Sequence, residues 1–218
     1  MPAMTVPTQV KICGLKTELA MDAALAGGAD YVGLVFFPPS PRNVSAAMAK
    51  VLAARARGRA KIVALMVDPD DALVAAVIAS ADPDLLQLHG EEPPERVAEI
   101  RRRWGKPVMK AIKVETAEDA ETALGYRGIA DLILFDARAP QDSTRPGGNG
   151  APFDWRTLHG IKDQIRYMLS GGLTPDNIAE AIRVTAADIV DVSSGVEARP
   201  GEKDPELIRR FLRAAKGV

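Results

Sequence analysis

The sequence predicts an α/β protein built as a single (β/α)8 barrel, also called a TIM barrel, that spans residues 1–218 and begins with a short N-terminal tail over residues 1–9. Eight short runs of apolar and β-branched residues alternate with helical stretches rich in alanine, leucine, glutamate and arginine. Successive runs start 21 to 34 residues apart, which leaves room for one helix and two loops between parallel strands. No linker divides the series, and eight such units fit a compact version of a fold that usually takes about 250 residues.

The eight expected strands share an apolar or β-branched composition. They are Val10–Cys13, Tyr31–Phe36, Ile62–Val67, Leu85–Leu88, Val108–Ile112, Leu132–Phe135, Arg166–Ser170 and Ile189–Val192. An open doubly wound sheet is the alternative for such an alternation. That fold commonly carries Gly-x-Gly-x-x-Gly after its first strand, and this chain has no such motif there, so the closed barrel is favoured.

Start and stop signals mark several of the helices between these strands. Gly27-Gly28 is expected to end the first helix, and Ser45 to cap the start of the next one. Thr174-Pro175 and Asp204-Pro205 each resemble an N-cap followed by proline at the first helical position. The second of these pairs precedes the last helix, expected over Glu206–Lys216.

Composition places the chain among ordinary globular proteins. Of its 218 residues 47% are hydrophobic and 26% charged, and the net charge is −1, which argues against nucleic acid as a partner. The basic runs Arg55 to Lys61 and Arg101 to Arg103 are interpreted as solvated helix faces. The dispersed histidines and cysteine predict no metal site.

The cysteine count and the hydropathy pattern indicate where in the cell the protein is located. A single cysteine excludes an intrachain disulfide and fits a reducing, cytoplasmic setting. The first nine residues lack the features of a secretory signal, and the longest strongly apolar run, Tyr31 to Phe37, is too short to span a membrane. We therefore expect a cytoplasmic protein without a membrane partner.

Two strand ends carry candidate acid–base groups, because the loops that follow the strands build the active site of such barrels. Lys11 and Cys13 share the interior face of the first strand by alternation, and a nearby ammonium would favour a thiolate and make Cys13 a usable base. Asp136 follows an apolar run and could hold a proton for donation. The alternatives are a small buried hydrophobic cysteine and an aspartate that orders the next loop.

Glycine-bearing turns after the seventh and eighth strands predict a phosphate site. Gly171, Gly172, Ser194 and Gly195 occupy the two loops whose backbone N–H groups commonly bind phosphate in barrels of this kind. Each turn alone is a weak signal, since Gly-Gly is a common turn. Their position after two neighbouring strands makes the pair more specific.

Three further polar residues are candidate substrate contacts. Arg42 lies in a proline-stiffened loop and could hold a carboxylate, or could be a surface arginine. His89 ends the fourth strand and could form a polar pocket wall or cap the next helix. Asp191 could accept a hydrogen bond from substrate or from a neighbouring strand end. The second histidine, His159, is expected to be structural.

The stretch from Ala137 to Asp154 contains Pro146-Gly147-Gly148-Asn149-Gly150 and therefore has low helix propensity. It could be a loose surface loop. Its position after the sixth strand favours a lid over the site, since long loops in compact domains are often functional.

Taken together, these motifs resemble the phosphoribosylanthranilate isomerase family of tryptophan biosynthesis. The resemblance covers about Val10 to Lys216 and is specific in the order and spacing of its motifs. The motifs are Lys11–Gly14, Gly33–Phe37 with Ser40-Pro41-Arg42, Gln87–Glu91, Gly147–Gly150 before Phe153-Asp154-Trp155, Leu169–Leu173 and Asp191–Glu197.

The resemblance implies a cofactor-free barrel enzyme that catalyses the Amadori rearrangement of N-(5-phosphoribosyl)anthranilate to 1-(2-carboxyphenylamino)-1-deoxyribulose phosphate. By motif, Cys13 matches the family's general base and Asp136 its general acid, although the sequence around Asp136 reads Phe-Asp-Ala-Arg and is a weaker match. Arg42 matches the arginine that holds the anthranilate carboxylate, and Asp191 a substrate-contacting aspartate. The glycine-bearing turns match the phosphate loops. A small phosphosugar is thus the expected partner, for a monomer or a homodimer.

Three rival functions remain open at this point. An indole-forming synthase of the same fold would release CO2, whereas the isomerisation releases none. A phosphate-ligand sensor would bind without turnover and would leave Cys13 and Asp136 unexplained. A sugar isomerase of double specificity usually relies on two aspartates, and here the first-strand position is Cys13.

Overall fold

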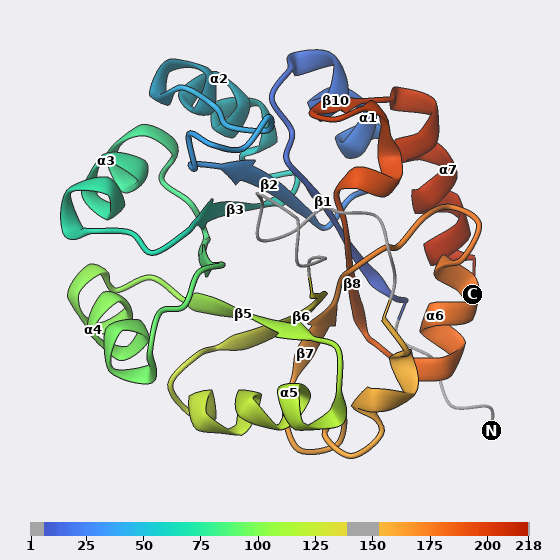
Figure 1. Cartoon of the computed structure of the whole chain (residues 1–218). Helices are drawn as coiled ribbons and strands as arrows, with labels where there is room; N and C mark the ends of the chain where they lie inside the picture. Colours follow the sequence, from blue (N-terminus) through green and yellow to red (C-terminus); the bar gives the residue numbers. More distant parts are fainter. Residues whose placement is uncertain (1–6, 139–152, 218) are drawn as a thin grey trace.

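The structure is a computed structural model that describes residues 7–138 and 153–217. Eight strands form one closed barrel in the order β1 to β8, and every neighbouring pair is parallel, including β8 with β1. Figure 1 looks along the barrel, with the helices arranged around it. The expected (β/α)8 fold is confirmed.

The barrel strands lie within a few residues of the expected positions. They are β1 (Gln9–Cys13), β2 (Tyr31–Val35), β3 (Lys61–Met66), β4 (Leu85–Leu88), β5 (Val108–Val114), β6 (Leu132–Ala137), β7 (Tyr167–Leu169) and β8 (Ile189–Val192). A short hairpin of β9 (Glu197–Arg199) and β10 (Glu202–Lys203) follows β8.

Seven α-helices cover the outside of the described barrel. They are α1 (Glu18–Ala26), α2 (Ala46–Ala56), α3 (Asp71–Ala81), α4 (Pro94–Trp104), α5 (Ala117–Glu121), α6 (Ile178–Thr185) and α7 (Pro205–Lys216). Three 3-10 segments complete the set: η1 (Thr122–Tyr126), η2 (Trp155–Leu158) and η3 (Ser194–Val196).

The helix signals of the sequence are confirmed at three places and wrong at one. Gly27 ends α1, the Ser45 hydroxyl accepts from Met48 N–H at the start of α2, and Asp204 caps α7. The helix expected to begin at Thr174-Pro175 begins only at Ile178. There the side chain of Asn177 accepts from Thr174 N–H and donates to the Gly172 carbonyl, so these residues form a turn instead.

The segment between β6 and β7 also departs from the regular alternation. Its described residues contain the 3-10 segment η2 and no α-helix. Residues 139–152 of the expected lid lie outside the described part of the chain.

Two apolar layers hold the barrel. Side chains of alternate strand residues fill the inside, and their neighbours along each strand pack under the helices. The inner layer consists of Tyr31, Val63, Leu85, Met109, Ala111, Leu132, Leu134, Met168 and Ile189. The outer layer includes Ile12, confirming that Lys11 and Cys13 face inward.

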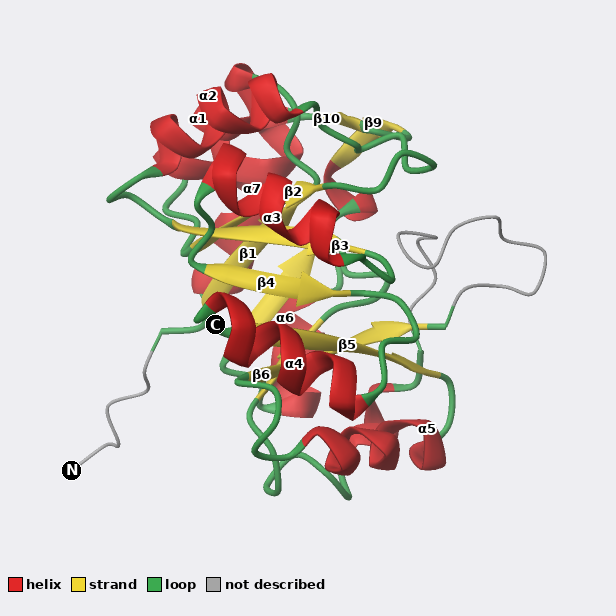
Figure 2. Cartoon of the chain, turned by 90° about the vertical axis from the view of Figure 1, so that its left-hand side faces the viewer, coloured by secondary structure: helices red, strands yellow, loops and turns green. Residues whose placement is uncertain are grey.

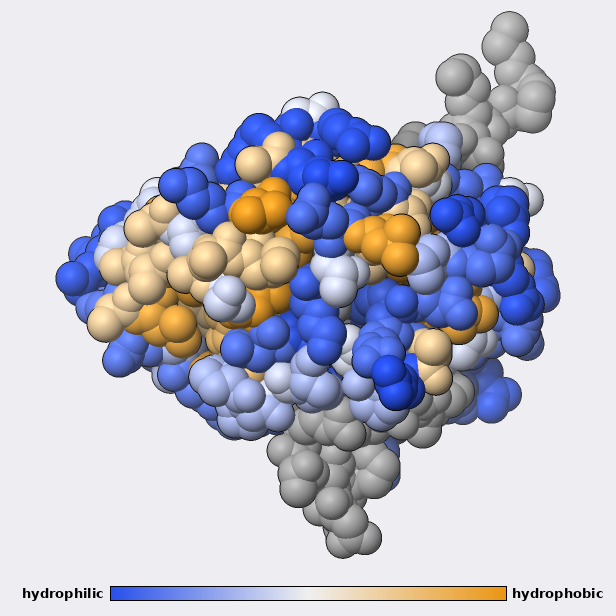
Figure 3. All heavy atoms as spheres, turned by 90° about the horizontal axis from the view of Figure 1, so that it is seen from above, coloured by the Kyte–Doolittle hydropathy of each residue, from blue (hydrophilic) through white to orange (hydrophobic). Residues whose placement is uncertain are grey.

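The surface mixes hydrophilic and hydrophobic residues (Figure 3). Met48 and Val51 of α2 are among the large apolar side chains exposed to solvent. The basic side chains of both runs, from the end of α2 to the start of β3 and in α4, are exposed, as expected. Within the described ranges, the helices are too short or too polar to cross a membrane.

Candidate active site

The candidate residues meet at one end of the barrel because all eight strands are parallel. Cys13 is the last residue of β1, His89 follows β4, and Asp136 and Asp191 lie near the ends of β6 and β8. Figure 2 shows several strand arrows pointing toward the side where β9 and β10 lie. This carboxyl-terminal end is where barrel enzymes carry their chemistry.

A buried ion pair lies beneath the thiol. Lys11 and Asp191 are register partners on β1 and β8, and Lys11 Nζ donates to Asp191 Oδ1 at 3.0 Å. Burial alone would lower the pKa of Lys11, but Asp191 and Cys13 outweigh it and raise the pKa, so the ammonium stays charged. Asp191 therefore binds a neighbouring strand end, which was the alternative interpretation of this residue.

The thiol of Cys13 is buried and has room only because glycine stands opposite it. A side-chain carbon on Gly33, its register partner on β2, would lie 2.9 Å from Sγ. Burial raises the pKa of Cys13, and the Asp191 charge raises it further, against the opposing effects of Lys11 and Lys203. The ammonium of Lys11 lowers the pKa of Cys13, as expected, but desolvation is the larger effect and the net shift is upward.

His89 joins two strands across the site. Its Nε2 lies 3.1 Å from Asp136 Oδ2, and its Nδ1 lies 2.9 Å from Gln87 Nε2. Asp136 is only 5% exposed, and its Oδ1 accepts from the N–H of Ala137. Both ring nitrogens have partners inside the barrel, so His89 faces the barrel interior and does not cap the next helix.

Arg42 is held by a carboxylate of the protein itself. Its Nε and Nη2 donate to the two oxygens of Glu197 at 2.7 and 2.8 Å, and the side chain is buried. Its aliphatic part packs over Gly14, where a side-chain carbon would lie 2.7 Å from Arg42 Cδ. The surface alternative for Arg42 is thus wrong, and one edge of the guanidinium is already occupied.

Lys203 shares Glu197 with Arg42. Its Nζ donates to Glu197 Oε1 at 2.6 Å and to the Ser193 carbonyl at 2.9 Å. Burial alone would raise the pKa of Glu197, but the hydrogen bonds and charges of Arg42 and Lys203 lower the pKa to about 2. Burial lowers the pKa of Lys203 to about 8, although Glu197 opposes this shift.

The two glycine-bearing turns pack against each other. Gly171 and Gly172 have φ values of 89° and 65°, which L side chains rarely adopt. A side-chain carbon on Gly195 would lie 1.9 Å from the Leu173 carbonyl oxygen, so only glycine allows the loops after β7 and β8 to approach this closely. Ser194 begins η3 beside this contact.

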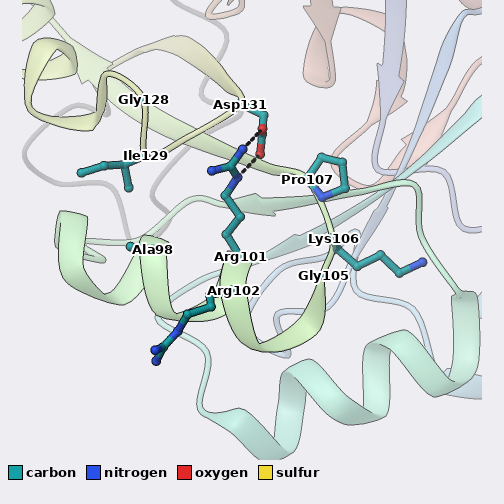
Figure 4. A pocket seen from close by; sticks show the side chains of 9 residues that line it. All are labelled: Ala98, Arg101, Arg102, Gly105, Lys106, Pro107, Gly128, Ile129 and Asp131. Atoms are coloured by element: carbon teal, nitrogen blue, oxygen red, sulfur yellow. Dashed lines mark hydrogen bonds and ion pairs between the residues drawn. The ribbon is translucent and has the colours of Figure 1, made fainter.

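A hollow of about 480 Å³ lies at the opposite end of the barrel (Figure 4). Residues before β5 and β6 and at the end of α4 line it, among them Arg101, Lys106 and Asp131. Arg101 donates two hydrogen bonds to Asp131, at 2.7 and 2.9 Å. The hollow is separate from the group of candidate residues, and it lies at the end of the barrel that serves stability in proteins of this fold.

Comparison with known proteins identifies the family. A model of "N-(5'phosphoribosyl)anthranilate (PRA) isomerase" matches residues 10–214. A protein of that name from Rhodopseudomonas palustris (strain BisA53) is 57% identical over 212 residues, which are 97% of each chain. The chain belongs to the N-(5'-phosphoribosyl)anthranilate isomerase family. The expected isomerase of tryptophan biosynthesis is confirmed at this level.

Solved structures of this isomerase family have the same fold. One, 36% identical, is described as a complex with reduced 1-(o-carboxyphenylamino)-1-deoxyribulose 5-phosphate; it matches with a TM-score of 0.84 over 97% of this chain and all of that one. Another, from Thermotoga maritima, is described as monomers generated from a dimeric isomerase. It is also 36% identical, with a TM-score of 0.84 and the same coverage.

Sequence reasoning missed three buried residues around the site. Gln87 and Glu197 lay within family motifs, but no role was assigned to either. Lys203 carried no signal, since a lysine in a short hairpin normally faces solvent. Only the fold, which turns this hairpin over the barrel end, buries its side chain.

The pKa of Glu197 leads to a stability prediction. The folded value of about 2 lies below the ordinary 4.5, so ionised Glu197 stabilises the fold above pH 4.5 and this contribution is lost as pH falls toward 2. We expect urea denaturation between pH 5 and 2 to show a steeper loss of free energy of unfolding in wild type than in Glu197→Gln. Glu180→Gln, at an exposed carboxylate of α6 with no ion pair in the described part of the chain, is the control and should keep the wild-type slope. Equal slopes for wild type and Glu197→Gln would contradict the assignment.

Proposed function

We propose that this chain converts N-(5'-phosphoribosyl)anthranilate to 1-(2-carboxyphenylamino)-1-deoxyribulose 5-phosphate without a cofactor, with Cys13 as general base and Asp136 as general acid. The observation that carries the proposal is the placement of these two buried groups at the carboxyl ends of β1 and β6, in a chain of this isomerase family. The description of a relative bound to a reduced form of this product supports the substrate class.

The reaction needs one proton delivered and one removed. Asp136 gives a proton to the furanose oxygen, the C1′–oxygen bond breaks, and the anthranilate nitrogen forms a Schiff base with C1′. Cys13 then removes the C2′ proton, whose electrons flow toward the iminium nitrogen, and the enolamine tautomerises to the ketone. Positioned acid–base groups typically contribute about 10²- to 10⁴-fold each.

The raised pKa of Cys13 fits this order of steps. The thiol must lose its proton before it can act as a base, and burial opposes the loss. The iminium that forms after ring opening places a positive charge beside the thiol, adding to Lys11 and Lys203. In this scheme the thiolate is favoured only once the first step has occurred.

The two ends of the substrate would be held by separate loops. The backbone N–H groups around Gly172 and Gly195 would bind the phosphate. Arg42 would bind the anthranilate carboxylate through the guanidinium edge that Glu197 leaves open, since a guanidinium carries five N–H donors. His89 and Asp191 would complete the pocket wall between them.

We further propose a cytoplasmic enzyme whose partner is this small phosphosugar, with no nucleic acid or membrane involved. The near-neutral net charge and the single cysteine support this. A monomer and a homodimer both remain compatible with the fold, and the Thermotoga maritima relative is described as dimeric. The direct test is an anthranilate-fluorescence assay in which the labile substrate is made in place and the loss of its emission is followed.

Replacement of the thiol tests the base. Cys13→Ser should keep the fold and lower kcat by about 10²- to 10⁴-fold, because a hydroxyl is a far weaker base than a thiolate at neutral pH. The measurement is kcat in the fluorescence assay, with circular dichroism as the folding control. Retention of most of the wild-type kcat would exclude the proposed role.

Replacement of the carboxyl tests the acid. Asp136→Asn should lower kcat by about 10²-fold or more while changing KM little, because the amide cannot donate an acidic proton. Initial rates over a range of substrate concentrations separate the two constants. An unchanged kcat with a raised KM would make Asp136 a contact residue only.

Displacement of the phosphate loop tests the anchor. In Gly195→Ala the new carbon collides with the Leu173 carbonyl, so the loop must shift and KM should rise by about tenfold, the cost of one weakened charged hydrogen bond. Gly125→Ala is the control, since its added carbon faces open space. A KM equal to that of the control would place the phosphate elsewhere.

A further inference from the structure

Gln87 is a fully buried amide that makes one hydrogen bond where it could make several. It faces the barrel interior from β4, and its Nε2 lies 2.9 Å from His89 Nδ1. Its Oε1 is buried and bonds to no residue in the described part of the chain. Buried polar atoms are seldom left without a partner, so this one requires a reason.

The chain of contacts determines where the ring proton lies. An amide nitrogen can only donate, so Gln87 Nε2–H requires His89 Nδ1 to be an acceptor. The neutral imidazole then carries its proton on Nε2, 3.1 Å from Asp136 Oδ2. In this arrangement Nε2–H donates to Asp136 Oδ2, and the contact requires no proton on Asp136.

Rotation of the amide by half a turn gives a second consistent arrangement. Gln87 Oε1 would then accept from a protonated Nδ1. This arrangement holds one proton more than the first, and the added proton lies in the hydrogen bond between His89 Nε2 and Asp136 Oδ2. Asp136 carries it when the imidazole is neutral, and Nε2 carries it when the ring is an imidazolium.

We propose that Gln87 is a positioning residue whose amide selects the His89 tautomer and thereby decides whether Asp136 stands as a carboxylate or as a proton-bearing acid. The Oε1 atom is central to this role, because within residues 7–138 and 153–217 no second hydrogen bond holds the amide in one orientation. Gln87 acts through His89, and the proposal rests on the acid role proposed for Asp136.

The charged groups around this relay already have partners. Lys113, the register partner of Asp136 on β5, pairs with Glu91, and Lys110 on the same strand pairs with Glu92 and the Gly90 carbonyl. On the β1 and β8 side, Lys11 pairs with Asp191 beneath Cys13. Gln87 is the neutral group that contacts His89 from the side away from Asp136.

The test uses the fact that the chain has two histidines. His159 is exposed, so His159→Asn leaves His89 as the only imidazole, and ¹⁵N-labelled histidine then reports its tautomer by NMR without reference to turnover. At neutral pH we expect Nε2 protonated and Nδ1 unprotonated. Gln87→Glu should put a proton on Nδ1, because a carboxylate accepts, and Gln87→Met should leave a mixture of tautomers.

Kinetics in the same background link the tautomer to the acid. Both Gln87 variants should lower kcat by about tenfold or more, because Gln87→Glu locks one arrangement and Gln87→Met selects neither, and should leave KM within about twofold. Gln164→Glu, at an exposed glutamine, is the matched control and should change neither constant. Melting temperatures identify a variant that fails to fold. In that case the other Gln87 variant alone tests the proposal.

Two results would overturn the proposal. One is a wild-type protein with Nδ1 protonated, or variants that keep the wild-type tautomer. The other is a changed tautomer with an unchanged kcat. Failure of the acid role itself would show differently, as full activity in Asp136→Asn with the tautomer results intact.

Discussion

Pairing of buried charge is the constraint on which this site depends. Lys11 with Asp191, Lys203 with Glu197 and Lys110 with Glu92 all have side chains that are at most 5% exposed. An unpaired charge in such surroundings costs several kcal/mol, so each partner fixes the position of the other. Each pair joins two different strands or loops. The ion pairs therefore fix the relative positions of these segments at the polar end of the barrel.

The same constraint shapes the chemistry. Around Cys13, burial raises the pKa of the thiol and outweighs the nearby ammonium groups. Under the proposed mechanism, the thiol then loses its proton only when the substrate brings positive charge into the site. The proposed base is thus kept away from solvent until a ligand is present, in a chain whose single cysteine is buried.

Most of the barrel could be predicted from the chain because its signals are local. The alternation of apolar and polar residues in Val10–Cys13 sets which side chains face inward, and Asp204 caps the helix that follows it. Thr174-Pro175 misled because Asn177 offers its side chain to the same backbone and forms a turn first. The start signals of helices were thus less reliable than the alternation within strands.

The partners of the site residues could not be predicted, since they lie far away in the chain. Arg42 meets Glu197 across 155 residues, and no local pattern near Arg42 indicates a carboxylate. Desolvation of Cys13 was also invisible, because it depends on how closely β2 approaches β1 at Gly33. These are properties of the closed barrel and not of any one segment.

The bond between Lys11 and Asp191 has a consequence for synthesis on the ribosome. The two residues are 180 positions apart, so the ammonium near the amino terminus emerges long before its counter-ion. At about 5–20 residues per second this delay is roughly 9–36 s. During that time Lys11 has no buried partner, so the first strand stays accessible to water. The barrel can therefore close only after nearly the entire polypeptide has been synthesised.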